Sequence, residues 1–417
     1  MFSIPNTFTK FSWQKTFAAL KYPNYRLWFI GQIISLIGTW VQITAQSFLL
    51  YELTHSMAYL GYIGLASGLP SIVLMLYGGV LADRFPRKNL LIITQTIMMI
   101  LAFILFFLVF SRMVKPWHIL LLATALGVVN AFDVPSRQAF VFELVDKKEL
   151  SNAIALNSTM FNLAAVIGPS LAGILYSYLG ASWCFIVNGF SFLGIIIILF
   201  RMKMVAVPPI EREKTLFKEL TVGISYCFKH ETIRLLIIIL ALISSLGMSY
   251  TTLLPAWAIN MLHGDAATNG YLHSARGVGS LGGALLVASL GNISKKYRLL
   301  YWGIFIFPIF LLFFAINSNL WLSLLCLSGV GFGLMIIFNT LNTLIQSLVD
   351  NRLRGRVLSI YSLAFFGGMP IGAFITGNVA ELIGARTTIL ISAITSLITA
   401  GIFYMKSKQL RLEKESQ

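Results

Sequence analysis

Long stretches of this sequence contain no Asp, Glu, Lys or Arg. The first runs from Leu27 to Tyr51, and nine more follow, of which one is interrupted by Arg276 and two are long enough for two helices each. A helix that crosses a bilayer needs about 20 apolar residues, so these stretches predict twelve spans. The chain is 57% hydrophobic and 11% charged, whereas about a quarter of the residues of a soluble domain are charged. The sequence therefore predicts an all-α membrane protein and excludes a soluble enzyme.

The predicted spans form two sets of six, separated by a charged linker. Near its start the linker contains Val207-Pro208-Pro209, and apolar residues between Leu216 and Cys227 recur at helical spacing, which predicts a short amphipathic surface helix. We expect five regions: a cytoplasmic N-terminal arm (1–24), a first six-helix bundle (25–202), a cytoplasmic linker with this helix (203–231), a second six-helix bundle (232–405) and a cytoplasmic tail (406–417).

The positive charges predict the orientation of the spans. Of the 31 Lys and Arg residues, only Arg112, Lys115 and Arg386 fall in loops of one face; apart from Arg276, all others fall on the face that carries both termini. Because Lys and Arg in short loops stay on the cytoplasmic side, we expect both termini in the cytoplasm of a bacterial cell and a multi-pass protein of the inner membrane. The net charge of +16 is then a topology signal with attraction for anionic membrane lipids, and no nucleic-acid partner is expected.

The two sets of spans resemble each other in sequence. The run 144–146, Leu-Val-Asp, recurs at 348–350, and the same offset of 204 residues pairs Gly168 with Gly372 without a gap. Around spans 2 and 8 the offset is 209 residues, which pairs Gly61 with Gly270. Two such repeats in the same orientation are typical of a transporter whose central site opens alternately to each side, so we expect two pseudo-symmetric bundles.

Polar residues follow one face of two predicted spans. In span 1 the spacing is 3, 4, 3 and 4 residues, which places all five on one side of a helix: Gln32, Ser35, Thr39, Gln42 and Gln46. Asn339 and Asn342 share a face of span 10. Because polar groups are unfavourable in lipid, we expect both sets to line a substrate cavity. The alternative is that these amides tie helices together through hydrogen bonds.

Arg276 is the one charge deep within a predicted span, and His273 precedes it by about one turn. A buried guanidinium must be paired or hydrated, and no carboxylate of the first half lies at a comparable depth. Its planar fork suits a carboxylate, catecholate or phosphate, so we assign both residues to the cavity and expect an acidic substrate. The alternative is that Arg276 extends to the membrane interface.

The loop after the second predicted span is the most specific motif. It reads Gly79-Val80-Leu81-Ala82-Asp83-Arg84-Phe85-Pro86-Arg87-Lys88 and resembles the signature loop of the major facilitator superfamily, with Pro86 in place of a glycine. The resemblance implies the fold of that superfamily: twelve spans in a 6+6 repeat. It also implies that Gly79 lets span 2 approach span 11, and that Asp83 latches the cytoplasmic side together with the basic residues around it, Arg84, Arg87 and Lys88.

Two further stretches narrow the resemblance. Gly168 and Pro169 open a run that resembles part of the span 5 antiporter motif, and Pro169 is expected to bend its helix. The stretches 38–42 and 133–158 resemble the transmembrane secretion effectors, a bacterial efflux subgroup that includes the enterobactin exporter. Proton-coupled members commonly carry an arginine in span 4, where this chain has Ala123. The nearest ionisable pair is Asp133 and Arg137, either a gate salt bridge, which we favour, or a proton-carrying site.

We therefore expect a secondary active transporter, a monomer without cofactors, that exports a small amphipathic or anionic molecule such as a siderophore by alternating access, with protons as the coupling ion. Multidrug or macrolide efflux is the alternative, and an importer or a lysophospholipid flippase is less favoured. A membrane-embedded enzyme is not expected, because the five histidines form no HExxH motif. An ion channel is disfavoured because no acidic ring or filter-like loop is apparent.

Overall fold

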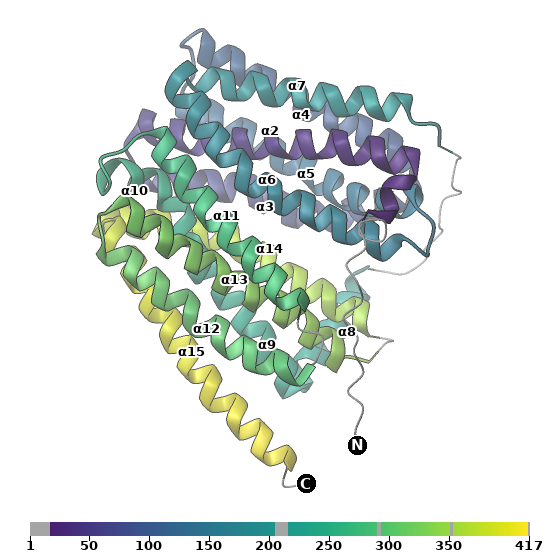
Figure 1. The fold of residues 1–417 in the computed structure, drawn as a ribbon, viewed down its shortest axis with the longest axis vertical. Helices are drawn as coiled ribbons and strands as arrows, with labels where there is room; N and C mark the ends of the chain where they lie inside the picture. The colour runs from purple at the N-terminus through teal and green to yellow at the C-terminus, as the bar shows by residue number, and fades with distance from the viewer. Residues whose placement is uncertain (1–16, 205–215, 290–292, 351–352, 416–417) are drawn as a thin grey trace, which may run out of the picture.

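The computed structural model describes residues 17–204, 216–289, 293–350 and 353–415, and every regular element in these ranges is helical (Figure 1). A short 3-10 helix, η1 (Ala18–Lys21), precedes the first half. The six helices of that half are α2 (Pro23–Thr54), α3 (Met57–Arg84), α4 (Arg87–Phe110), α5 (Pro116–Leu144), α6 (Leu150–Leu179) and α7 (Ala181–Arg201).

The second half follows a helix in the linker, α8 (Leu216–Lys229), which packs against the first turns of α14. Its first crossing consists of four consecutive segments: α9 (Glu231–Leu242), η2 (Ile243–Gly247), η3 (Met248–Leu253) and α10 (Leu254–Asn260). The five other crossings are α11 (Ala266–Ser289), α12 (Ile293–Ile316), α13 (Leu320–Leu348), α14 (Arg354–Ile383) and α15 (Ala385–Glu415).

Eleven of these crossings are long and apolar enough to span a bilayer, counted over the described residues. The twelfth crossing is α11, which is more polar because it carries Asn269, His273 and Arg276. Since α10 ends on one face of the molecule and α12 begins on the other, α11 also crosses (Figure 1). We call the face at which α2 begins the terminal face, and the face at which α2 ends the opposite face.

The internal repeat extends to the backbone of the turns on the opposite face. His55 and His263, which follow the first crossing of each half, both adopt a left-handed conformation with φ of 49°. Gly180 and Gly384, which join the last two crossings of each half, have φ of 91° and 83°. Residues other than glycine are strained at the φ values of Gly180 and Gly384, which explains why both halves have glycine at this turn.

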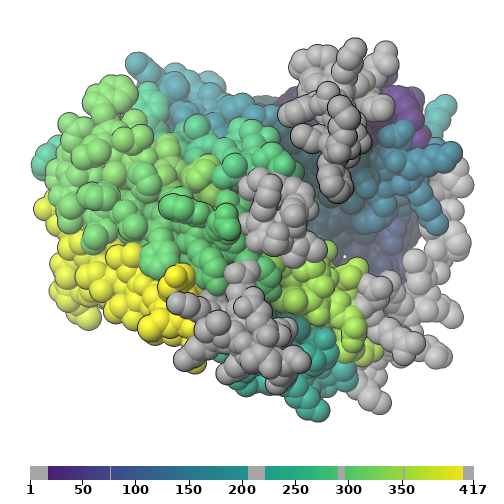
Figure 2. Space-filling view, turned by 60° about the horizontal axis from the view of Figure 1, so that its bottom comes forward, coloured from purple at the N-terminus to yellow at the C-terminus, as the bar shows by residue number. Residues whose placement is uncertain are grey.

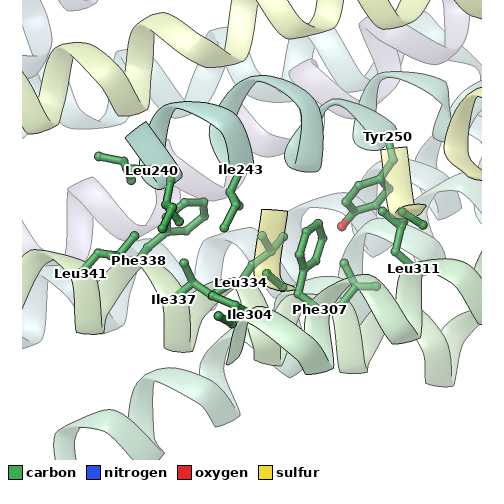
Figure 3. Packing of buried hydrophobic residues seen from close by; sticks show 14 of the residues in the cluster. Leu240, Ile243, Tyr250, Ile304, Phe307, Leu311, Leu334, Ile337, Phe338 and Leu341 are labelled. Atoms are coloured by element: carbon green, nitrogen blue, oxygen red, sulfur yellow. The ribbon is translucent and has the colours of Figure 1, made fainter. Parts of the chain in front are cut away.

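Each half has its own apolar interior. In the second half a large cluster joins the first crossing to α12 and α13 and includes Leu240, Phe307 and Leu334 (Figure 3). In the first half, Trp28 packs edge-on against Phe140, with their ring centroids 5.1 Å apart, near the terminal face. The large apolar clusters thus lie within single halves, while a small cluster of Tyr51, Leu60 and Ala256 joins the halves near the opposite face.

The first crossing of the second half departs from regular α-helix near its middle. Ile243–Gly247 is a π-helical turn and Met248–Leu253 is 3-10 helix. This irregular segment packs closely on α14, where a Cβ atom on Gly372 would lie only 1.7 Å from the carbonyl oxygen of Ser245. Irregular turns of this kind inside a helix frequently mark functional sites or hinges.

Candidate substrate route and gates

The two halves meet mainly through two pairs of helices, α3 with α14 and α6 with α11, and α2 makes smaller contacts with α10 and α11. On α3, Gly61 approaches Gly377 so closely that a Cβ atom on Gly377 would lie 2.7 Å from the Cα atom of Gly61. On α11, a Cβ atom on Gly270 would lie 2.4 Å from the carbonyl oxygen of Pro169. Both contacts lie in the part of the helices nearest the opposite face, so the halves are closed there.

Towards the terminal face the same helices separate. Gly79 and Gly367 lie further along the facing sides of α3 and α14, and a Cβ atom on either would find no neighbouring heavy atom within 4 Å. Pro370 of α14 contacts Gly68 of α3, but Leu363 and Phe366, four to seven residues before Pro370, are 47% and 45% exposed. In Figure 1 the halves converge at the left and diverge towards α8 at the lower right. Figure 2 turns the bottom of that view forward and shows blue atoms of the first half recessed behind green atoms of the second.

The contact between α6 and α11 ends beside Arg276. The next residue, Gly277, is the last glycine of α11 in close contact with α6, where a Cβ atom would lie 2.9 Å from the carbonyl oxygen of Ala165. That oxygen has no intrahelical donor, because Pro169, four residues on, lacks an N–H group. Ala288, three turns further along the side of α11 that carries Gly277, is exposed. Arg276 therefore lies where the separated space between the halves begins.

Arg276 belongs to a polar stripe on the inner side of α11. Asn269, His273, Arg276 and Ser280 fall between the side of α11 that contacts α6 through Gly277 and the side that contacts α13 through Gly279. Within the described part of the chain, Arg276 has no ion-pair or hydrogen-bond partner. Buried nitrogens of Asn269 (Nδ2), His273 (Nδ1) and Arg276 (Nε) have no hydrogen-bond partner there either. A guanidinium without a partner at this depth is electrostatically suited to an anion.

The span 1 amides differ from the expected cavity wall. Four of the five predicted side chains are only 1–6% exposed: Gln32, Ser35, Gln42 and Gln46. Gln42 accepts a hydrogen bond from Asn188 Nδ2 on α7 at 2.7 Å, and Gln46 donates one to the carbonyl oxygen of Ile119 on α5 at 3.5 Å. In this conformation they connect helices within the first half, and Thr39 alone is half-buried. A polar stripe specifies one side of a helix but not whether a cavity or another helix faces it.

Asn339 and Asn342 on α13 are half-buried. Asn342 accepts a hydrogen bond from the exposed side chain of Gln346 one turn on, and the carbonyl oxygen of Asn339 accepts one from Thr343. Both asparagines thus remain partly accessible, unlike the amides of α2, and their role in the substrate route stays a prediction.

The signature loop forms a network within the first half. Arg87 pairs with Asp83 at 3.5 Å and with Glu143, at the end of α5, at 2.6 Å. Lys88 donates a hydrogen bond to the carbonyl oxygen of Met202 at 2.7 Å, and Arg84 is exposed. These contacts join α3, α4, α5 and the end of α7, all in the first half, and the role of Asp83 as a latch of the terminal face stays a prediction.

Gly168 and Pro169, which open the run on α6 that resembles the antiporter motif, each lie at a close contact with another helix. A Cβ atom on Gly168 would lie 2.4 Å from the Cβ atom of Trp40 on α2. Pro169 contacts Gly270 of the second half, as described above. The pair therefore fixes how closely α6 approaches both α2 and α11.

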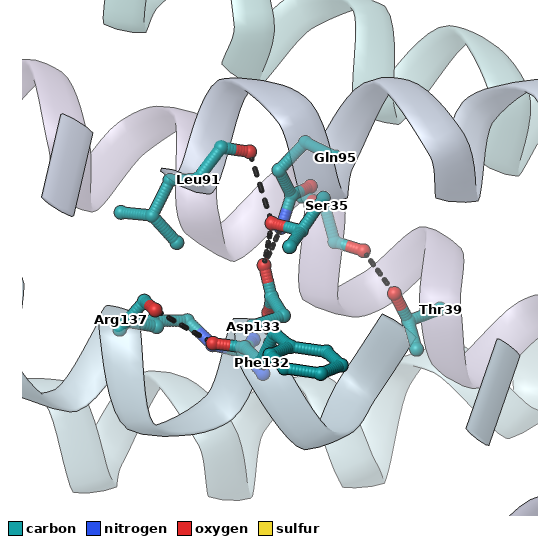
Figure 4. A network of polar contacts seen from close by, with 9 residues as sticks. Ser35, Thr39, Leu91, Gln95, Phe132, Asp133 and Arg137 are labelled. Carbon is teal, nitrogen blue, oxygen red and sulfur yellow. Dashed lines mark hydrogen bonds and ion pairs between the residues drawn. The ribbon is translucent and has the colours of Figure 1, made fainter. Parts of the chain in front are cut away.

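Asp133 is the most deeply buried carboxylate on α5, with 1% of its surface exposed (Figure 4). One oxygen accepts hydrogen bonds from Thr94 Oγ1 at 2.8 Å and from Gln95 Nε2 at 2.9 Å, both on α4. The other lies 3.2 Å from an Arg137 nitrogen one turn along α5. All these partners belong to the first half, so in this conformation the pair does not bridge the two halves.

Several residues of these networks were not expected from the sequence. Thr94 and Gln95 are polar residues within a long apolar span, so the sequence could have predicted that they need polar partners inside the protein. Glu143, by contrast, lies at the end of a helix, where acidic residues are common. Its partner Arg87 comes from another helix, and no local pattern predicts such a pairing.

Two matched six-helix bundles, closed against each other at one face and separated at the other, define a transporter of the major facilitator superfamily. Within it, the chain belongs to the family described as transmembrane secretion effector, which it matches over residues 14–417. This confirms the predicted all-α transporter fold and the family, and it excludes the enzyme alternative.

Curated relatives span nearly the whole chain. The staphyloferrin A transporter of Staphylococcus aureus is 25% identical over 393 residues, which cover 94% of this chain and 98% of the relative. Macrolide efflux protein A of Streptococcus pyogenes is 24% identical, with coverage of 94% and 98%. The enterobactin exporter EntS of Citrobacter koseri is 26% identical, with coverage of 94% of both chains.

Solved structures share the fold at lower sequence identity. A bacterial homolog of the human lysosomal transporter Spinster, in an inward-facing and unoccupied conformation, superposes with a TM-score of 0.71 at 14% identity, covering 95% of this chain and 98% of that one. The nucleoside transporter NupG superposes with a TM-score of 0.70 at 13% identity, covering 92% and 98%.

Proposed function

We propose that this protein exports a small acidic molecule, of which an acidic siderophore is the first candidate, from the cytoplasm in exchange for protons. The observation that carries the proposal is Arg276, a guanidinium without an acidic partner in the described residues, at the point where the space between the halves begins. Two of the relatives named above carry siderophores in their names, which supports the same class of substrate.

The proposed direction rests on the charge distribution. If the terminal face is cytoplasmic, as the positive charges predict, the separated space opens to the cytoplasm. Substrate would then enter from the cytoplasm and meet Arg276 at the inner end of the space. Closure of the terminal face and opening of the opposite face would release it outside.

Asp133 is the proposed proton-carrying group. Since its partners Thr94, Gln95 and Arg137 all belong to the first half, the structure favours this alternative over a gate salt bridge between the halves. Protonation would remove the charge that Arg137 and the two donors stabilise, and so change the packing of α4 against α5. A buried carboxylate at such a depth is a reasonable site for the coupling ion.

Binding to the purified protein tests the substrate class. Arg276→Gln leaves a shorter but still polar side chain and removes the charge, so affinity for an acidic siderophore such as enterobactin should fall by roughly tenfold to a hundredfold. The matched control is Arg386→Gln, because Arg386 lies exposed on the opposite face and donates to Ser318 at 2.6 Å. Equal affinities for wild type and Arg276→Gln would refute the assignment.

Macrolide efflux is the second candidate, and a specific observation favours it. Leu363 and Phe366, on the side of α14 that faces α3, present apolar surface towards the separated space, which suits a large amphipathic molecule. In that case, Arg276→Gln would leave macrolide binding within about twofold of wild type, while Phe366→Ala would weaken it by roughly tenfold.

A further inference from the structure

A carboxylate of the second half caps a helix of the first half at the opposite face. Glu381, in the last turn of α14, accepts hydrogen bonds from the backbone N–H groups of Met57 at 2.6 Å and Ala58 at 3.2 Å. These are the first two residues of α3, whose N–H groups have no partner within the helix. Ser56, at the usual capping position, makes no side-chain cap, so Glu381 supplies it from the other half.

The internal repeat places a second cap in the related position. Ser177 on α6 lies 204 residues before Glu381, the offset that relates the two halves. Its hydroxyl accepts a hydrogen bond from the backbone N–H of Ala267, near the start of α11, at 3.2 Å and donates one to Asp265 at 2.8 Å. Ala267 in turn lies 209 residues after Ala58, the offset found for spans 2 and 8. Each half thus caps the second crossing of the other.

The two caps differ in charge. Glu381 places a negative charge at the positive end of the α3 dipole, whereas Ser177 is neutral and the charge beside it, Asp265, belongs to the half that it caps. A carboxylate at a helix N-terminus is stabilised by the dipole as well as by its hydrogen bonds. Separation of the halves at this face would break both caps, and loss of the charged Glu381 cap would cost more free energy than loss of the neutral Ser177 cap.

We propose that Glu381 and Ser177 are reciprocal caps that hold the opposite face closed, and that Glu381 sets most of the balance between the two open states. The proposal rests on alternating access but not on the identity of the substrate or on Arg276. Loss of the Glu381 cap shifts the population towards the form open at the opposite face, by roughly threefold to tenfold for an exposed cap of this type.

Distance measurements between spin labels test the proposal in the full chain, with Cys184, Cys227 and Cys326 replaced. Trp117 and Trp321, exposed at the opposite face, carry one label pair; Asn89 and Arg298, exposed near the terminal face, carry the other. In Glu381→Ala the first distance should lengthen and the second should shorten. Glu381→Gln, which keeps an acceptor but loses the charge, should show a smaller shift in the same direction, and Ser177→Ala a smaller shift than Glu381→Ala.

The matched control is Glu52→Gln. Glu52 is also acidic and near the opposite face, but it accepts its hydrogen bond from Tyr176 of the same half, so its loss should leave both distances unchanged. If Glu381→Ala does not fold, the label distances measured in Glu381→Gln test the proposal instead. Distances that match wild type in a folded Glu381 variant overturn the proposal, as does an equal shift in Glu52→Gln. Unchanged substrate binding by Arg276→Gln would refute the proposed substrate site without affecting this proposal, since the label distances are measured without substrate.

Discussion

Gly78 and Gly79 are neighbours on α3 but face different surroundings. A Cβ atom on Gly78 would lie 1.9 Å from the carbonyl oxygen of Ala131 on α5, whereas one on Gly79 would find no heavy atom within 4 Å. Gly78 therefore packs within its own half, and Gly79 faces the space that α14 must enter when the terminal face closes.

A leucine at Gly79 should trap the protein with its terminal face open. The side chain finds free space in the present conformation but would collide with α14 on closure, so transport should fall by roughly tenfold or more while the protein stays folded. Spin-label distances across the terminal face should remain long in the presence of substrate. Gly194→Leu is the control, because Gly194 is exposed on α7 with no neighbour within 4 Å. Equal transport by both variants would show that Gly79 does not face a closing contact.

An alanine at Gly78 should act on stability instead. Its methyl group would overlap the backbone of α5, and overpacking of this kind costs about 1–3 kcal/mol. Thermal unfolding in detergent should therefore occur at a lower temperature in Gly78→Ala than in Gly79→Ala. The reverse order would contradict the packing described here.

Neutralisation of Asp133 should uncouple transport from the proton gradient. Asp133→Asn keeps the size of the side chain and its hydrogen bonds to Thr94 and Gln95, but it cannot bind or release a proton. Exchange of substrate across the membrane should persist, while accumulation against a gradient should be lost. Asp83→Asn is the comparison, since Asp83 belongs to the terminal-face network; accumulation by Asp133→Asn at the wild-type level would exclude Asp133 as the coupling site.

Asp265 should make the opposite face sensitive to strong acid. Partial burial pushes its pKa up, but hydrogen bonds from Thr268 and Ser177 outweigh this effect and hold the pKa below its ordinary value. The carboxylate therefore stabilises the fold above about pH 4, and this contribution is lost as the pH falls through the lowered pKa. The unfolding temperature of wild type should fall more steeply below about pH 4 than that of Asp265→Asn. Parallel curves would exclude this group.

The thiol of Cys227 in the linker helix should react slowly. Burial raises its pKa, and the side chain is 4% exposed in the interior of the second half, so little thiolate is available at neutral pH. In a variant that keeps Cys227 alone, maleimide labelling should be slow in the native protein and fast after denaturation. Rapid native labelling would show that α8 does not pack as described.

The fold was predictable because lipid imposes a strong constraint on sequence. Uncharged stretches of span length predicted the helices, and glycines repeated at offsets of 204 and 209 residues predicted which crossings of the two halves correspond to each other. The turn at Gly180 was equally readable, since few residues tolerate its backbone conformation. None of these inferences required knowledge of which helices touch.

The site was only partly predictable, for physical reasons. The polar stripe of span 1 was identified, but Gln42 and Gln46 hydrogen-bond to neighbouring helices, which the sequence does not specify. The partner of Glu381 lies more than 300 residues away in the chain, and no local pattern encodes such a contact. Arg276 could be identified from the sequence alone, because a charged residue within a membrane span is rare.

Transport into inside-out membrane vesicles tests the central claim most directly. With a proton gradient that makes the vesicle interior acidic, a labelled acidic siderophore should accumulate inside above its external concentration. Accumulation should collapse when an uncoupler is added and should be lost in Arg276→Gln but not in Arg386→Gln. Accumulation that ignores the uncoupler, or that occurs only in right-side-out vesicles, would contradict proton-driven export.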